Sequence, residues 1–555
     1  MSEESPSGFV ISASAEPTAP ATPISKDTNE SELPLTRIQF ILVFTGLFLA
    51  LLVVPLDTSI VAPGLQAIFM DLGHQSLLPW VGSAYTLAAA PVGIVFGKLA
   101  QEFGCKWMLI LALVLFEAGS LMSAVSKSMI FLVVGRIVTG LGGGGMGAVI
   151  NIVMSEICTV KERAKYQGIL GMAYGLAYLL GPVVGGVLTD HISWRWCFYI
   201  NIPIGVFAII VCIAFLRNTS KAGTVSTIAS RFIQIDFLGT IVLFAAMIAI
   251  DTPLQLGGNQ WKWNSISSIL CFIAFVILIV LFIHLEMNVI KNPLIPRRVF
   301  LNKTILAFSA ISFALGAAMF AMLYYNALFF QIVFGDTAVE SGVRTYPLVI
   351  SFIVLSIASG AIFSRTDHYG SFFIFGPLVW SGGFILTAFL DANSSQAHRI
   401  LAMIVLGVGV GSMLQLRVSA MQHTVDPDLM FVGTGLIASI LYAGGTMAVS
   451  TTGAILDNIV ASKTSSSNVI SGVLKVLEAK GIQIDLSQYL AASAAFSRLS
   501  VEFPEQSQEF VAAKSELVGA FNSAFQVANL SLIGFVVVIL VCVPFIWQTK
   551  RKEEK

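Results

Sequence analysis

The sequence predicts an all-α polytopic membrane protein. Of its 555 residues, 56% are hydrophobic and only 11% are charged, whereas a soluble globular chain carries roughly 25% charged residues. Fourteen apolar runs follow one another along the chain, each close to the length of about 20 residues that crosses hydrocarbon as a helix. The formal net charge is zero, so the composition does not indicate a nucleic-acid partner.

The predicted spans lie near residues 40–62, 77–97, 107–125, 130–151, 168–189, 197–216, 237–254, 266–285, 305–331, 343–363, 372–390, 398–420, 432–456 and 527–547. Two of them, the seventh and the thirteenth, are the least expected to run as single helices. Pro253 interrupts the seventh, and the thirteenth contains the glycine-rich stretch "YAGGTMAVSTTG".

Lysine and arginine are unevenly distributed between the loops. If the N-terminal tail is cytoplasmic, the inner loops hold most of these residues, and each short outer loop holds at most one. This asymmetry follows the positive-inside rule, and an even number of spans agrees with it. We therefore expect both ends of the chain on the cytoplasmic side.

Three charged residues lie inside predicted spans of the first half. Asp57 is the only charged side chain between Ile41 and Ala62, and a carboxylate at a helix centre costs on the order of 3 kcal/mol. Glu117 lies in the third span and Arg136 in the fourth. An arginine in lipid must face a polar interior and find a partner. Asp57 and Arg136 therefore form either a functional pair or an ion pair that only holds helices together.

Glycine motifs mark two spans. The fifth contains "GLAYLLGPVVGG", in which Gly181 and Gly185 are four residues apart and share a helix face. The fourth contains "GLGGGGMG", which matches G-x-G-x-x-G but lies inside an apolar run, so it favours close helix packing over dinucleotide binding. The six cysteines form no close pair, and neither a Walker A nor an H-E-x-x-H sequence occurs. We expect no enzyme activity, cofactor or metal.

Two similar polar turns indicate internal repetition. "GKLAQEFGCK" (97–106) and "GAIFSRTDHYG" (360–370) occupy the same place in two sets of six spans, a pattern typical of secondary transporters. The predicted domains are a disordered cytoplasmic tail (1–36), a six-helix bundle (37–217), a linker with two inserted transmembrane helices (218–300), a second six-helix bundle (301–548) and a short cytoplasmic tail (549–555). The second bundle includes an external loop (457–526).

Together these stretches resemble the major facilitator superfamily, and specifically its fourteen-span drug:proton antiporter branch in fungi. "PLDTSIVAPGL" resembles the signature of the first span, "GRIVTGLGGGG" the arginine motif of the fourth, and "GLAYLLGPVVGG" the antiporter motif of the fifth. "WRWCFYINIPIG" (194–205) resembles the sequence that enters span six, and the resemblance covers residues 37–547. The turn at 97–106 departs from the family pattern at Gln101, Glu102 and Cys105, and only Lys106 keeps its basic character.

The resemblance implies a major facilitator fold and a proton-coupled secondary active transporter. Such a protein exports small organic molecules (drugs, toxins or secondary metabolites) by alternating access. The implied partners are protons, a small-molecule substrate and the lipid bilayer. A monomer in the plasma membrane is expected, with the vacuolar membrane as the alternative. A fourteen-span importer, a siderophore transporter and a non-transporting receptor stay open.

Candidate site residues fall into four groups. The implied proton-coupling residues are Asp57, Arg136 and Glu117. The antiporter motif comprises Gly175, Gly181, Pro182, Gly185 and Gly186, and the gating turn comprises Gly97, Gly104 and Lys106. Position and polarity suggest a substrate cavity lined by Tyr85, Asn326, Gln331, Gln415 and Tyr442.

Overall fold

The computed structural model describes residues 36–74, 77–78, 80–217, 236–257, 261–467 and 508–553. These residues are almost entirely helical and contain no β-strand. Thirteen of their helical segments are long and apolar enough to cross a membrane, and Phe372–Ala388 is a shorter apolar helix. The prediction of an all-α polytopic membrane protein is confirmed, and each predicted span corresponds to one of these helices.

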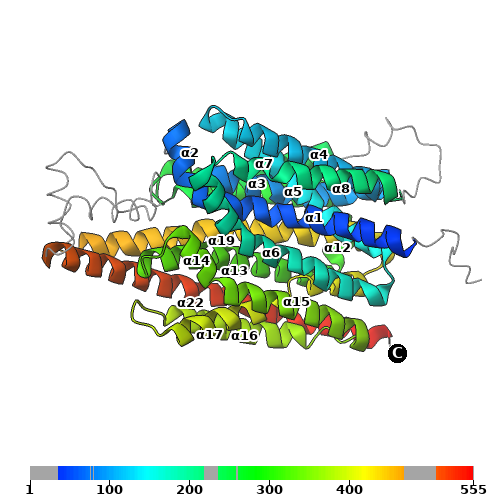
Figure 1. The fold of residues 1–555 in the computed structure, drawn as a ribbon. Coiled ribbons are helices and arrows are strands. Elements are labelled where there is room, and N and C mark those ends of the chain that lie inside the picture. Colours follow the sequence, from blue (N-terminus) through cyan, green and yellow to red (C-terminus); the bar gives the residue numbers. More distant parts are fainter. Residues whose placement is uncertain are drawn as a thin grey trace, which may run out of the picture.

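The first bundle occupies the upper half of Figure 1. Its long helices are α1 (Arg37–Val61), α3 (Trp80–Phe103), α4 (Cys105–Ala124), α5 (Met129–Ile157), α6 (Val160–His191) and α8 (Asn201–Phe215). Short helices α2 (Leu65–Leu72) and α7 (Trp196–Tyr199) precede α3 and α8. Helix α5 packs against α3 and α4, and α1 packs against α6 and α8.

The second bundle occupies the lower half of Figure 1. Its members are α13 (Lys303–Val333), α15 (Tyr346–Thr366), α16 (Phe372–Ala388), α17 (Gln396–Gly411), α18 (Leu416–Thr424), α19 (Pro427–Ser465) and α22 (Gln508–Glu553). Short helices α12 (Arg297–Leu301) and α14 (Ala338–Arg344) lie before α13 and α15. The start of α1 and the end of α22 lie at the same end of the molecule.

The predicted external loop at 457–526 is shorter in the structure. Its first residues continue α19 to Ser465, and its last residues belong to α22, which begins at Gln508. The stretch "EFVAAKSELVGAFNSAF" within the predicted loop is helical and is the beginning of the last spanning helix. Residues 468–507 of this loop lie outside the described residues.

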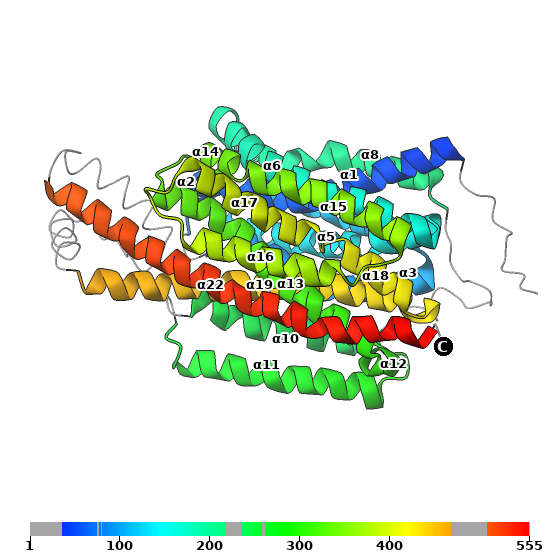
Figure 2. The same ribbon diagram turned by 90° about the horizontal axis from the view of Figure 1, so that it is seen from below.

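Two helices stand between the bundles in sequence, α10 (Phe237–Leu256) and α11 (Ile266–His284), and a π-helical turn (Leu285–Val289) follows α11. Helix α10 packs against α19 and α3, whereas the main partner of α11 is α10. Figure 2 shows α11 at the edge of the molecule. Ile266, Leu270 and Ile277 of α11 are among its many exposed apolar residues, so this helix faces lipid.

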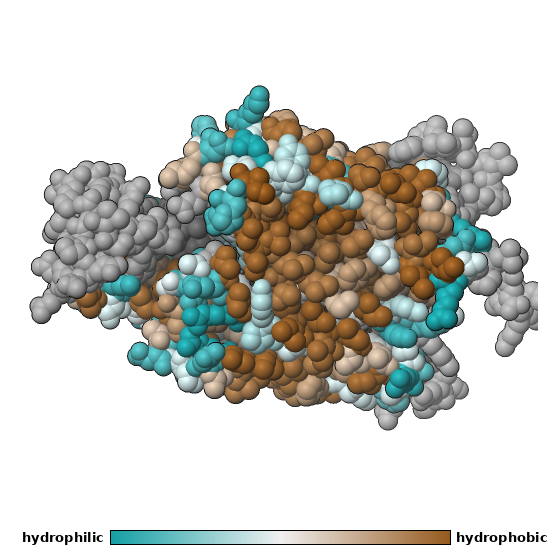
Figure 3. Space-filling view, viewed as in Figure 1, coloured by the Kyte–Doolittle hydropathy of each residue, from teal (hydrophilic) through white to brown (hydrophobic). Residues whose placement is uncertain are grey.

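The surface agrees with a membrane-embedded chain. In Figure 3 a broad hydrophobic band crosses the middle of the molecule, and hydrophilic residues gather at its two ends. Exposed Ile, Leu, Val and Phe side chains occur on α4, α8, α11 and α16. A band of this extent on a soluble monomer would far exceed the usual few hundred Å² of contiguous apolar surface.

The two spans least expected to run as single helices are both unbroken. Both α10 and α19 are continuous. Pro253 lies in the last turn of α10, where its ring disturbs few backbone hydrogen bonds, and Gly444 of α19 packs against the backbone of Phe313. The twelfth span is interrupted instead, because residues 412–415 form a turn between α17 and α18. Sequence periodicity did not reveal this break.

Candidate functional site

A buried ion pair joins α1 and α5. Arg136 Nη1 donates to Asp57 Oδ2, and the two side chains are 1% and 0% exposed. Arg136 Nε also donates to the carbonyl oxygen of Val81, at 2.9 Å. The guanidinium lies over the ring of Tyr85, 4.9 Å from its centroid, and 5.7 Å from that of Phe198. The structure thus brings Asp57 and Arg136 together and gives the cation aromatic neighbours, which favour it electrostatically.

Asn201 completes the coordination of the carboxylate. Its Nδ2 atom lies 3.0 Å from Asp57 Oδ1 and 3.3 Å from Ser120 Oγ, and all three residues are fully buried. Both carboxylate oxygens therefore accept a hydrogen bond from a side chain. The prediction did not include Asn201, although an amide inside the apolar stretch "YINIPIG" is a signal that could have found it.

Close packing of α5 against α3 and α4 fixes the position of Arg136. A Cβ atom on Gly119 of α4 would meet the backbone nitrogen of Thr139, and one on Gly142 of α5 would meet that of Phe116. On another face of α5, a Cβ on Gly140 would meet the carbonyl of Tyr85 in α3. The glycine run of the fourth span therefore lets α5 approach two helices at once.

Glu117 lies on α4 beside the ion-pair cluster but does not join it. Its carboxylate lies against Gly205 of α8, one turn beyond Asn201. Neither carboxylate oxygen has a hydrogen-bond partner among the described residues. Glu117 faces α8 rather than the space between the bundles.

The fifth-span motif faces two directions. Gly181 and Gly185 pack against α1, where added Cβ atoms would meet Ser59 Oγ and the carbonyl oxygen of Ile60. The other three motif residues face the second bundle: Gly175 lies against Ile353, Pro182 against Gly342 and Gly186 against Val339. The motif thus forms part of the seam between the two bundles.

The same seam continues towards the end that carries both termini. A Cβ on Gly168 of α6 would lie 2.6 Å from the carbonyl oxygen of Ser356 in α15, and Ser356 Oγ donates to the carbonyl of Gly168 at 3.1 Å. Across the seam between α3 and α19, a Cβ on Gly97 would lie 3.0 Å from the carbonyl of Phe431. The two bundles are therefore in backbone contact at this end.

The predicted gating turn separates into two roles. Gly97 belongs to the seam. Gly104 has a φ of 89° and precedes the first residue of α4, a conformation that a side chain rarely adopts. Lys106 Nζ donates to the carbonyl of Ile213 at the end of α8, at 2.7 Å. Lys106 therefore binds within its own bundle.

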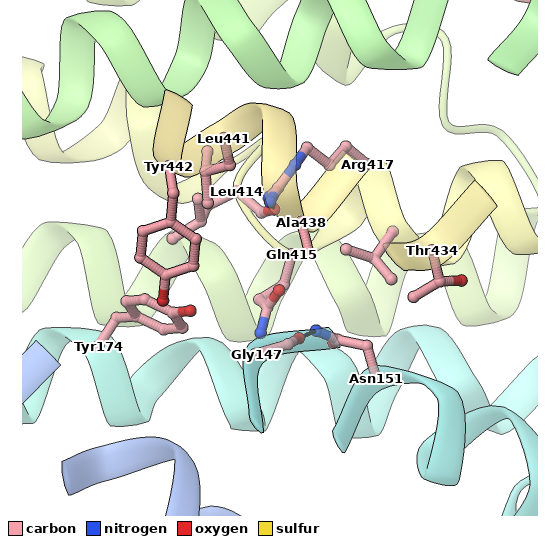
Figure 4. A pocket seen from close by; sticks show the side chains of 11 residues that line it. Gly147, Asn151, Tyr174, Leu414, Gln415, Arg417, Thr434, Ala438, Leu441 and Tyr442 are labelled. Atoms are coloured by element: carbon pink, nitrogen blue, oxygen red, sulfur yellow. Dashed lines mark hydrogen bonds between the residues drawn. The ribbon is translucent and has the colours of Figure 1, made fainter. Parts of the chain in front are cut away.

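A small polar pocket lies between the bundles, and Figure 4 shows its lining. The first bundle contributes Gly147, Asn151 and Tyr174, and the second contributes Leu414, Gln415, Arg417, Val418, Thr434, Ala438, Leu441 and Tyr442. Two of the five predicted cavity residues, Gln415 and Tyr442, line it. Tyr85 lies beside it, with its hydroxyl against Gly143. Asn326 and Gln331 do not line it, and Gln331 Nε2 is within 3.1 Å of Ser341 Oγ.

Arg417 is the principal pocket residue that the prediction missed. It is 3% exposed and follows the break between α17 and α18. Its Nε atom donates to Ser312 Oγ at 3.0 Å, and Nη1 donates to the carbonyl of Leu414. An arginine deep inside the apolar run at 398–420 was a visible signal, because a charge within a span is costly.

The described residues contain no group of three or more His, Cys, Asp or Glu side chains that could hold a metal ion. Two helical bundles that meet at glycine-lined seams around a polar pocket define a transporter-type membrane protein.

Comparison with known proteins agrees with this class. The family model described as Major Facilitator Superfamily matches residues 47–449. The "MFS-type efflux pump MFS1" of Trichophyton rubrum is 30% identical over 503 residues, which cover 90% of this chain and 91% of that protein. The "Efflux pump aflT" of Aspergillus parasiticus is 29% identical over 508 residues, which cover 91% and 96% of the two chains.

A solved structure shows the same fold. The proton:xylose symporter XylE matches with a TM-score of 0.55 at 13% identity, covering 92% of this chain and 95% of that chain. The chain belongs to the major facilitator superfamily.

Proposed function

We propose that this protein is a proton-coupled secondary transporter that exports small organic molecules by alternating access. The observation that carries the proposal is the ion pair between Asp57 and Arg136, fully buried in a bundle that faces lipid. The relatives named efflux pumps support export as the direction of transport.

The proton step would involve Asp57. In this conformation Arg136 and Asn201 each donate to one of its carboxylate oxygens. Uptake of a proton by Asp57 would be linked to a rearrangement of α1, α5 and α8, the helices that carry Asp57, Arg136 and Asn201. A carboxylate whose donors differ between two conformations can take up a proton on one side and release it on the other. Glu117 is the second candidate for this step.

Alternating access would use the glycine seams. The seams join α6 to α15 and α3 to α19 at the end that carries both termini. Rocking of the bundles would separate these backbones and open the pocket to that side. Small residues suit such a surface, since no interlocked side chains need to be withdrawn.

The remaining assignments belong to the same proposal. Two six-helix bundles (37–217 and 301–548) form the transport unit, with two helices inserted between them. The protein acts as a monomer in the plasma membrane, with both termini cytoplasmic, and needs no cofactor. The excess of Lys and Arg in the loops on the side of the termini supports this orientation.

The test combines substrate identification with a driven-transport assay. Untargeted comparison of metabolites in medium and cells, with and without the gene, identifies exported compounds. Purified protein in liposomes is then given that compound and an imposed pH gradient. We expect accumulation against the concentration gradient that disappears when a protonophore dissipates the pH gradient.

Three outcomes would contradict the proposal. Depletion of the compound from the medium would indicate an importer, and dependence on ferric siderophore would indicate a siderophore transporter. Signalling without flux would indicate a receptor.

A further inference from the structure

Arg417 is a buried cation without a counter-charge. Its two recorded hydrogen bonds go to neutral acceptors, the hydroxyl of Ser312 and the carbonyl of Leu414. No carboxylate of the described residues lies within ion-pair distance of it. A buried charge without an ionic partner is costly, and the cost is greater inside a membrane.

None of the four acidic residues that lie well inside the described spans pairs with Arg417. Asp57 pairs with Arg136, and Glu117 lies against Gly205. On the inserted helices, Asp251 accepts from Ser450 at 3.4 Å and Glu286 from the backbone of Ile295 at 3.0 Å. The part of the chain that the structure describes therefore supplies no counter-charge for Arg417.

Neutral donors converge on the same pocket. Gln415 Nε2 is buried and has no hydrogen-bond partner among the described residues, and the Tyr442 hydroxyl lies against that of Tyr174. In Figure 4 Gln415, Arg417 and Tyr442 come from the second bundle, and Asn151 and Tyr174 face them from the first. One cation and one unused amide donor on one wall match a group that only accepts hydrogen bonds, such as a carboxylate.

The rest of the lining limits what the anionic group is attached to. Leu414, Val418, Ala438 and Leu441 form the apolar part of the wall, which suits a hydrocarbon or aromatic body. The carbonyl oxygen Oδ1 of Asn151 is the one buried acceptor in this lining that lacks a partner, and it would bind a ligand hydroxyl.

The break between α17 and α18 supports a ligand at this position. Residues 412–415 leave the helix directly before Arg417, and interrupted helices near the midplane form substrate sites in secondary transporters. The space now holds about one water molecule. A larger ligand would enter when the bundles separate.

We propose that Arg417 is the counter-ion for the substrate, and that the substrate is a small organic acid with an apolar body. This inference rests on the proposed transport function of the same pocket. Arg417 would bind the carboxylate through its guanidinium, and Gln415 would donate to the same group.

The experiment measures binding, so that it does not depend on transport. Purified full-length protein in phosphatidylcholine nanodiscs is titrated with a panel of matched pairs, each an aromatic or aliphatic carboxylic acid and its neutral amide, starting with 1-naphthoic acid and 1-naphthamide. We expect acids to bind at least tenfold more tightly than their amides. Arg417→Gln should abolish this preference, and Arg417→Lys should keep part of it because the charge remains.

Arg365→Gln is the matched control. Arg365 is exposed near the end of α15 and does not line the pocket. It removes the same charge and should leave the acid preference unchanged. Thermal melting of each variant checks folding. A folded Arg417→Gln variant that keeps the acid preference would contradict the proposal. If Arg417→Gln does not fold, Arg417→Lys decides: it should keep only part of the preference, and an unchanged preference would contradict the role of the guanidinium.

Two further results would overturn the inference. Wild-type protein that binds no acid of the panel more tightly than its amide has no such site. Loss of acid binding on adding phosphatidylglycerol to the nanodiscs would assign the site to a lipid headgroup. Acid-selective binding without pH-driven transport would leave the anion site intact and would instead refute the proposed function.

Discussion

Arg136 and Arg417 are the two buried arginines among the described residues, and only Arg136 faces a carboxylate. Each lies in the fourth span of its six-span bundle, Arg136 on α5 and Arg417 on α18. Asn151, which lines the pocket, is fifteen residues beyond Arg136 on α5, or about 22 Å along the helix axis. The ion pair and the pocket are therefore separate places joined by one helix, which suits coupling between a proton step and a binding step.

We predict that Asp57→Asn abolishes transport driven by a pH gradient while exchange of substrate for substrate continues. Asparagine keeps the shape of the side chain and removes its titrating group. Flux in liposomes with and without an imposed pH gradient checks this. Asp190→Asn is the control, because Asp190 is exposed at the end of α6. Concentration of substrate by Asp57→Asn would make Asp57 a structural residue.

The same substitution should also lower stability, because it leaves Arg136 buried without its partner. Breaking a buried ion pair from one side costs about 3–5 kcal/mol. The double variant Asp57→Asn/Arg136→Gln removes both charges, so its melting temperature should recover towards that of the wild type. A double variant less stable than Asp57→Asn would show that Arg136 stabilises the fold mainly through Val81, Tyr85 and Phe198.

Arg136→Lys should keep some transport, and Arg136→Ala almost none. Lysine retains the charge opposite Asp57, but a single ammonium group lacks the planar fork that also reaches the carbonyl of Val81. We expect Arg136→Lys to lose about tenfold in rate. Initial rates at equal amounts of reconstituted protein measure the effect. Equal rates for Lys and Ala would remove the charge of Arg136 from the mechanism.

Gly185→Leu should stop transport, since its Cβ atom would meet the carbonyl oxygen of Ile60, and backbone cannot withdraw as a flexible side chain can. Overpacking of this kind costs about 1–3 kcal/mol. Gly82→Leu and Gly382→Leu are matched controls, because a Cβ atom at either position meets nothing within 4 Å. Normal transport by a well-expressed Gly185→Leu protein would show that α1 and α6 need not approach so closely.

The contact between Asp71 and Arg195 predicts a weak acid sensitivity outside the membrane. The Arg195 side chain, at 2.7 Å, holds the pKa of Asp71 below its usual value, and Trp194 Nε1 adds a hydrogen bond at 3.1 Å. A lowered folded-state pKa gives stability that is present above the unfolded value of about 3.9 and is lost as the pH falls through the folded-state pKa.

Because Asp71 is half-exposed, this contact is worth at most about 1 kcal/mol. Asp71→Asn should lower the melting temperature at pH 7 by no more than about 2 °C. The difference between wild type and variant should shrink as the pH falls through the lowered folded-state pKa of Asp71. A difference that stays constant as the solution is acidified would mean that the carboxylate charge is not the cause.

Hydropathy was enough to place the helices and to predict a polytopic membrane protein, because the length and apolar character of a span are local properties of about 20 residues. The motifs of spans one, four and five likewise identified Asp57, Arg136 and the glycines one at a time. Neither hydropathy nor spacing revealed which charged side chains would contact each other.

The pairings depend on how helices far apart in sequence rotate and pack. Asn201 reaches Asp57 across 144 residues, and Glu117, which looked equivalent to Asp57, turns instead towards Gly205. Arg417 became a site residue because the turn at 412–415 and the opposing bundle leave it at a pocket with no carboxylate nearby. Such a site is formed by side chains from both bundles, so only their packing against each other decides which polar groups meet and which stay unpaired.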